Sequence, residues 1–238
     1  MRPAFLSTPL EPPRVNWKVV AGLVLAAIIA WATPFDLAFG AATFGLPILR
    51  AAAIVALALI GLRVGGRIGL GVEAKGLGRP ILTPLAVAAV VAVGCVAADG
   101  LFRAVLQPAY VHSMSTAPLA MRIAGYMMRA FNENIIYRLF LGSVLVWLIG
   151  RRWKTDDGRP TDGAYWLGFA LAQGANIWIN VTSQAPLTPL GVLHDALRYF
   201  APGMVWSWLY WRHGFQSNEI ACTGVHLFFQ PLSVLGLK

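Results

Sequence analysis

Charged residues are scarce in this sequence: Asp, Glu, Lys and Arg make up 12% of its 238 residues, against about a quarter in a typical soluble domain. This shortage excludes an ordinary soluble domain. Only two cysteines are present, Cys95 and Cys222, and both lie in apolar runs, so neither a disulfide framework nor a zinc cluster is predicted. His-x-x-x-His and Cys-x-x-Cys spacings are also absent, and the sequence predicts no metal and no cofactor.

Acidic residues are fewer than basic ones, 10 against 19, which gives a formal net charge of +9. The basic excess does not predict a nucleic-acid partner, because Lys and Arg stand between apolar runs, as the positive-inside rule describes for membrane proteins. The mean hydropathy is +0.64, and several apolar runs reach or approach the ~20 residues that cross a bilayer. The sequence therefore predicts an all-α fold, a polytopic membrane helix bundle surrounded by the lipid bilayer.

The predicted topology has a disordered cytoplasmic tail, 1–16, followed by one transmembrane domain, 17–238. Lys and Arg are in excess in every alternate loop, which favours seven crossings of a cytoplasmic (inner) membrane with the N-terminus inside; eight result if 119–130 also inserts. The sequence leaves the oligomeric state open. The helix predicted over 119–150 is too long for one upright crossing, so its first turns are expected to lie along the outer interface or to form a separate helix. The other predicted spans are 17–31, 46–62, 81–98, 164–181, 197–211 and 219–235.

Several residues between the spans are predicted to be exposed. The segment 99–118 is expected to form an outer connection, and His112, His194 and His213 are expected to be solvated. Glu219 is expected at the mouth of the last helix, where a carboxylate suits the positive end of the helix dipole.

Three of the late helices carry polar residues at helical spacing, so each set shares one face of its helix. Hydrocarbon cannot satisfy polar groups, so these three stripes are expected to face one another or a water-filled cavity. The stripes are Arg122, Tyr126, Arg129, Glu133 and Tyr137; Phe169, Gln173, Asn176 and Asn180; and Glu219, Thr223, His226 and Gln230.

Glu133 is the residue around which a function can be argued, because a carboxylate inside hydrocarbon survives only if it is paired or faces a polar cavity. One interpretation is a structural ion pair that locks two helices together. The other is a reaction centre in which Glu133 acts as general base on a water and His226 orients that water or stabilises an oxyanion. On an ideal helix Arg138 points about 140° away from Glu133, so it is better placed beneath Asn134.

These residues resemble the CAAX-protease and bacteriocin-processing family of intramembrane glutamic endopeptidases. The family's first motif, Glu-Glu-x-x-x-Arg, is matched at Glu133, Asn134 and Arg138. Its second motif, Phe-x-x-x-His, is matched from Phe169 to Gln173. Its last motif, a His followed four residues later by Asn or Asp, falls on His226 and Gln230. The resemblance covers roughly 131–231, within a CAAX-protease-like core of about 119–236.

The resemblance implies hydrolysis of a peptide bond in a membrane-anchored or lipidated substrate. It assigns catalytic roles to Glu133, His226 and Arg138, and substrate- or water-positioning roles to Asn134, Phe169, Gln173, Asn176 and Gln230. The chain departs from the family pattern because Asn134 replaces the second Glu, Gln173 the motif His, and Gln230 a shorter residue. Two interpretations follow, a diverged protease that relies on Glu133 and an inactive member that binds a membrane partner. A small transporter lined by the polar stripes is a third.

A question of depth accompanies this resemblance. Measured along their helices, Glu133 lies about 27 Å from the inner boundary near Arg151, whereas Gln173 lies only about 15 Å from Gly163. The two residues are therefore expected at different depths unless a helix tilts or breaks.

Overall fold

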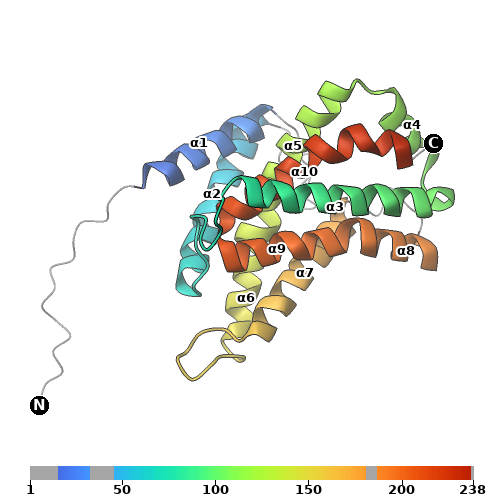
Figure 1. Cartoon of the computed structure of the whole chain (residues 1–238). Helices are drawn as coiled ribbons and strands as arrows, with labels where there is room; N and C mark the ends of the chain where they lie inside the picture. The colour runs from blue at the N-terminus through green and yellow to red at the C-terminus, as the bar shows by residue number, and fades with distance from the viewer. Residues whose placement is uncertain (1–15, 33–45, 181–186, 237–238) are drawn as a thin grey trace, which may run out of the picture.

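The computed structural model describes residues 16–32, 46–180 and 187–236 (Figure 1). Every regular element among these residues is helical, apart from one isolated β-bridge between Lys154 and Pro160, which confirms the prediction of an all-α fold. All but the last residue of the predicted tail, 1–16, lies outside the described residues. The helices are α1 Trp17–Ala32, α2 Pro47–Arg67, α3 Leu82–Leu101, η1 Arg103–Val105, α4 Pro108–Thr116, α5 Leu119–Asn134, η2 Ile135–Gly142, α6 Ser143–Gly150, α7 Asp162–Asn180, α8 Pro189–Asp195, η3 Ala196–Phe200, α9 Ala201–His213 and α10 Phe215–Gly236.

Three of the described helices are long and apolar enough to cross a membrane: α2, α3 and the continuous helix Leu119–Gly150 that α5, η2 and α6 form together. The shorter helix α1 is also apolar. The outward faces of these helices carry large apolar side chains, such as Leu59 on α2 and Val90 and Leu101 on α3, which are 51%, 74% and 77% exposed. Such a surface is costly in water and suits contact with lipid.

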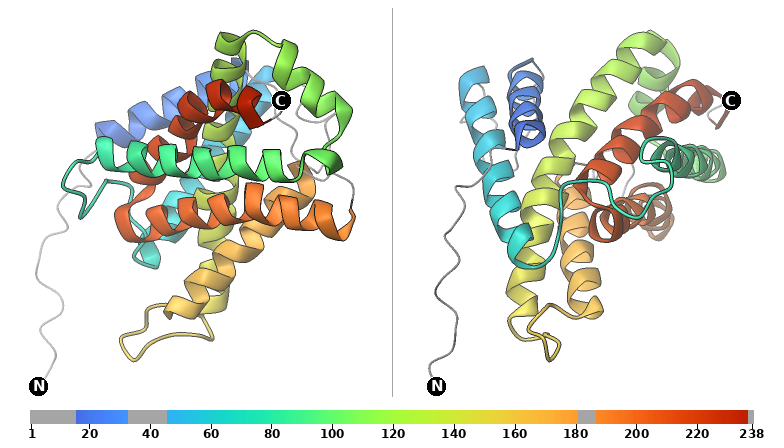
Figure 2. Two further views of the ribbon diagram at one scale, coloured as in Figure 1. Left: turned by 45° about the vertical axis from the view of Figure 1, so that its right-hand side comes forward. Right: turned by 60° about the vertical axis from the view of Figure 1, so that its left-hand side comes forward.

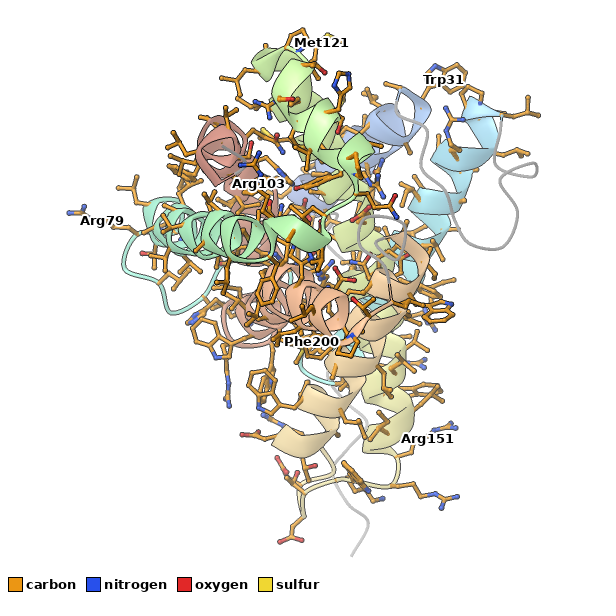
Figure 3. The ribbon with its side chains drawn as sticks, turned by 90° about the vertical axis from the view of Figure 1, so that its right-hand side faces the viewer. Trp31, Arg79, Arg103, Met121, Arg151 and Phe200 are labelled. Carbon is orange, nitrogen blue, oxygen red and sulfur yellow. The ribbon has the colours of Figure 1, made fainter. Side chains whose placement is uncertain are left out.

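The helices cross one another rather than forming a parallel bundle. Figures 1 and 2 show α3, α10 and the continuous helix made of α8, η3 and α9 running side by side across the molecule. The helix 119–150 and α7 run across this group, and α1 and α2 pack together on the other side of the long helix (Figure 2). In Figure 3, Met121 and Arg151 mark the two ends of the long helix, which runs the length of the molecule.

Local sequence signals fix where several helices begin. Pro47, Pro108 and Pro189 each stand in the first turn of a helix, where the missing N–H costs nothing and the fixed φ suits the helix. Thr188 caps α8, because its hydroxyl oxygen accepts a hydrogen bond from the N–H of Gly191 at 3.1 Å. Proline and a capping hydroxyl therefore set these boundaries more firmly than hydropathy does.

The long helix contains an unusual segment, since η2 is a π-helix in which hydrogen bonds span five residues instead of four. It packs tightly against α2 at Gly61. A Cβ on Gly61 would lie 2.7 Å from the backbone carbonyl carbon of Leu139, so only glycine lets the two backbones approach this closely. Five of the eight residues from Ile135 to Gly142 belong to or pack against the same apolar core. This segment re-orients the residues that follow Glu133 relative to a regular α-helix.

The connector between α2 and α3 is tied to the turn between α9 and α10. The N–H of Phe215 donates to the carbonyl oxygen of Gly71 at 2.9 Å, and the N–H of Lys75 donates to the carbonyl oxygen of His213 at 3.0 Å. Between them Gly214 adopts φ 88° and ψ 159°, a conformation that is essentially restricted to glycine. The connector thereby holds the start of α10 in place.

Two expectations about the segments between spans are wrong. Asp99 does not lie in an outer connection; it belongs to the last turns of α3 and is fully buried, because it continues the buried face that carries Ala88, Ala92 and Cys95. His194 is not solvated either. Its side chain is fully buried at the end of α8, where carboxylates bind both ring nitrogens.

Candidate functional site

A cavity of about 150 Å³ lies where the long helix, α7, η3, α9, α3 and α10 meet. At about 30 Å³ for each water in the liquid, it has room for about five water molecules. Its polar wall is formed by Tyr110, Tyr126, Arg129, Glu133, Arg138, Gln173, Asn176, Arg198, Tyr199, His226 and Gln230. Its apolar wall includes Val91, Met114, Trp206, Val225 and Phe229.

Six of the eight predicted site residues line this one cavity. They come in pairs from three helices: Glu133 and Arg138 from the long helix, Gln173 and Asn176 from α7, and His226 and Gln230 from α10. Residues from all three predicted polar stripes are thus brought together in one place. Gln173 lies level with Arg138, which follows Glu133 on the long helix. Glu133 and Gln173 nevertheless line the same cavity, because the two helices cross there.

The π-helical segment explains how Glu133 and Arg138 reach the same cavity. Five residues apart on an ideal α-helix, they would point about 140° away from each other. The wider turn of η2, with hydrogen bonds that span five residues, brings side chains at this spacing much closer to one face. The sequence carries no periodic signal for such a turn. The two side chains line the same cavity but bind different partners, Arg129 and Gln173.

Glu133 is paired within its own helix, but by Arg129 and not by Arg138. The Nε of Arg129 donates to the Oε1 of Glu133 at 2.6 Å, one helical turn away. The side chains are 43% and 21% exposed, so the pair is neither dry nor sealed. Arg129 is therefore the ion-pair partner of Glu133 in the site.

Arg138 and Gln173 form the second polar contact of the site. The Nη2 of Arg138 donates to the Oε1 of Gln173, and the Nε2 of Gln173 donates to the backbone carbonyl oxygen of Tyr199 at 3.0 Å. Both side chains are buried. The amide of Gln173 therefore links η2 to η3.

His226 belongs to α10 and faces the long helix, which carries Glu133. Its ring stacks on that of Tyr126, with centroids 5.5 Å apart, and its Nδ1 lies 3.4 Å from the Nε2 of Gln230. With the amide donating, Nδ1 is the acceptor and a neutral imidazole carries its proton on Nε2. The Oε1 of Gln230 is buried and has no hydrogen-bond partner among the described residues, so an acceptor is available to a water or a ligand.

The two remaining predicted residues, Asn134 and Phe169, do not line the cavity. Asn134 is fully buried against the start of α10, where its Nδ2 donates to the Oε2 of Glu219 at 2.8 Å and its Oδ1 accepts from the Nδ2 of Asn218 at 3.0 Å. Glu219 therefore binds a side chain of the long helix rather than standing at a helix mouth. Phe169 packs edge-on against Tyr210 in the apolar core. Both residues position helices in the structure.

Sequence reasoning missed a buried network beside the cavity, centred on Asp99. Its Oδ1 accepts from the Nε of Arg198 at 3.0 Å and lies 3.1 Å from the Nε2 of His194, while its Oδ2 accepts from the hydroxyl of Tyr110 at 3.0 Å. The Nδ1 of His194 lies 3.0 Å from the Oδ1 of Asp195. The network joins α3, α4, α8 and η3, and two of its members, Tyr110 and Arg198, line the cavity. The spacing of Asp99 from the buried Ala88, Ala92 and Cys95 was the available signal.

Gly203 on α9 provides a test of how tightly the Gln173 amide is held. A Cβ at this position would overlap the Gln173 side-chain amide, which two hydrogen bonds fix in place. We expect Gly203→Ala to displace Gln173 and to lower stability by about 2–4 kcal/mol, from overpacking together with lost buried hydrogen bonds. The midpoint of thermal unfolding in detergent micelles measures this.

Gly174→Ala is the matched control, because a Cβ there meets no atom within 4 Å. Equal unfolding midpoints for the two variants would contradict the proposed rigidity of Gln173.

Among residues 16–32, 46–180 and 187–236, no three His, Cys, Asp or Glu side chains form a group that could hold a metal ion. Comparison with protein-family models, with curated proteins and with solved structures gives no match, so the family resemblance rests on the motif residues alone.

Proposed function

We propose that this protein is an intramembrane endopeptidase that hydrolyses a peptide bond in a membrane-anchored or lipidated substrate. It crosses the cytoplasmic (inner) membrane seven times with its N-terminus inside. The observation that carries the proposal is the convergence of Glu133, His226 and four further polar side chains on one cavity, between helices whose outward faces are apolar. A polar cavity among membrane helices is expensive, and its usual use is a reaction or a binding event.

In this mechanism Glu133 takes a proton from a water in the cavity as the water oxygen attacks the scissile carbonyl carbon. The new C–O bond converts the carbonyl to an oxyanion, and the Nε2–H of a neutral His226 and the Arg138 guanidinium are the donors available to stabilise it. The C–N bond then breaks, and the proton held by Glu133 passes to the leaving amine. The Oε1 of Glu133 is engaged by the Nε of Arg129, so substrate entry has to loosen that contact before Glu133 accepts the proton.

A second function, binding without cleavage, is favoured by that same ion pair. The Nε of Arg129 lies 2.6 Å from the Oε1 of Glu133. In addition, the neutral amide of Gln173 occupies the motif position at which the family that this chain resembles has a histidine. A protein of this kind would capture a membrane-anchored peptide in the cavity and release it intact.

The Glu133→Gln variant separates the two functions. The protein, reconstituted in liposomes, is given a library of N-terminally lipidated peptides, and products are identified by mass spectrometry. General base catalysis contributes about 10²–10⁴-fold, so we expect the variant to lose at least about 100-fold in initial rate while its unfolding midpoint is kept.

The matched control is Glu73→Gln, which removes an exposed carboxylate in the connector between α2 and α3. Equal cleavage by wild type and Glu133→Gln would overturn the endopeptidase proposal. Peptide capture without cleavage by either protein would establish the binding function.

A further inference from the structure

We propose that the cavity binds an oxyanion, a carboxylate or a phosphate group, on the guanidinium of Arg138. This inference names a class of ligand for the site of the proposed function. It rests on that function only for the statement that the ligand is a substrate. Its test measures binding rather than turnover, so either can fail without the other.

The charges of the cavity wall leave one positive charge without a partner. The wall contains three guanidinium groups, from Arg129, Arg138 and Arg198, and a single carboxylate, Glu133. Arg129 is paired with Glu133 at 2.6 Å, and Arg198 is paired with Asp99, behind the wall, at 3.0 Å. Arg138 is the wall cation left over.

Arg138 has no carboxylate within 4.0 Å among the described residues, and its one hydrogen-bond partner there is the neutral amide of Gln173. Glu219, on α10, interacts with Arg138 electrostatically but makes no salt bridge with it, and its Oε2 accepts from Asn134. The Arg138 side chain is only 4% exposed, so bulk water does not compensate its charge. A buried guanidinium without a counter-ion is strongly unfavourable, and a cation in this state is a binding site for an anion.

The other buried arginine of the long helix, Arg122, has both terminal nitrogens engaged by protein acceptors, and only its Nε has no hydrogen-bond partner among the described residues. Arg122 donates to the carbonyl oxygens of Met114 and Gln230 and to the hydroxyl of Ser233, at 2.5–3.1 Å, and it does not line the cavity. Arg138 faces the cavity and uses one donor of its five on Gln173. The remaining fork suits two-point recognition of a carboxylate or phosphate.

The size and lining of the cavity describe the rest of the ligand. Its volume of about 150 Å³ admits a group the size of one amino-acid residue. Next to the cationic wall stand Trp206, Val225 and Phe229, which suit an apolar chain. The ligand is therefore an oxyanion attached to an apolar group, as in the free C-terminal residue of an apolar peptide or the head of an anionic lipid.

The test uses the full chain in phosphatidylcholine nanodiscs and three probes: an N-acetylated tri-leucine peptide with a free carboxylate, the same peptide as C-terminal amide, and phosphatidylglycerol mixed into the nanodisc. Affinity for the peptides is measured by thermophoresis, and the lipid effect by the unfolding midpoint. We expect the free acid to bind at least about 10-fold more tightly than the amide, and Arg138→Gln to abolish this preference. Arg151→Gln, at the exposed end of the same helix, should keep it.

Gln173→Glu is the second variant, in case Arg138→Gln fails to fold. It places a carboxylate where the amide oxygen now accepts from Arg138, so an internal anion fills the site, while the N–H that Gln173 donates to Tyr199 is lost. We expect the preference for the free acid to disappear with an unfolding midpoint within about 4 °C of wild type, which corresponds to a small change in stability.

Each outcome bears on the inference. Equal affinity for acid and amide, with no midpoint shift from phosphatidylglycerol, would overturn it, as would a preference that survives in Arg138→Gln or Gln173→Glu. An Arg138-dependent shift with phosphatidylglycerol alone would identify the oxyanion as a lipid phosphate. Selective binding of the acid without cleavage would support the inference while the endopeptidase proposal fails.

Discussion

Asp99→Ala is expected to destabilise the protein by about 3–5 kcal/mol, the range found when one partner of a buried ion pair is removed. Asp99 is fully buried and accepts hydrogen bonds from Arg198 and Tyr110, and it faces the Nε2 of His194. Its removal leaves the guanidinium of Arg198, 12% exposed, without a carboxylate. The unfolding midpoint in detergent micelles should fall by about 6–20 °C.

Asp156→Ala is the matched control, since this aspartate lies in the exposed turn between α6 and α7. Asp99→Asn, which keeps the volume and one acceptor, should fall between the alanine variant and wild type. If Asp99→Ala and Asp156→Ala have the same unfolding midpoint, the Asp99 network does not support the cavity wall.

Gly214→Ala is expected to cost about 2–6 kcal/mol, from two sources that add. The backbone conformation of Gly214, φ 88° and ψ 159°, is essentially restricted to glycine and costs another residue about 1–3 kcal/mol. A Cβ would also lie 2.9 Å from the backbone carbonyl carbon of Glu73, so the connector would have to move, at about 1–3 kcal/mol for overpacking. The unfolding midpoint and the yield of folded protein in detergent measure the combined effect.

Gly158→Ala isolates the conformational part of that cost. Gly158 also has a positive φ, 80°, but a Cβ there meets no atom within 4 Å. We expect it to lower the midpoint by roughly half as much. Equal losses in the two variants would mean that the connector does not press on the turn between α9 and α10.

The sequence predicted the helices and the polar stripes well, because both follow periodic rules. Apolar runs of membrane-spanning length and steps of three and four residues are local patterns, and they brought out Glu133, Gln173 and His226, which line one cavity. The catalytic roles of these residues and the count of seven crossings remain predictions.

The pairings were less predictable, because they depend on helix geometry and on distant residues. The π-helical turn after Asn134 turns Arg138 toward Gln173, and no periodic pattern announces such a turn. Asp99 and His194 are 95 residues apart in sequence, and their contact follows from how α3 lies beside α8 and η3. Their polarity alone predicted solvent exposure, and the fold buries them together.

The wide turn at Ile135–Gly142 also determines what kind of genetic change the protein can survive. A π-helical turn is equivalent to one extra residue inserted into an α-helix. Losing a single codon within this stretch would let regular α-helical winding return, and the missing residue and the tighter turn would offset each other, so the segments before and after it would keep their relative orientation. In the regular α-helix on either side, each lost residue rotates everything beyond it by about 100°. A one-residue in-frame deletion should therefore be tolerated better within this stretch than in α5 or α6.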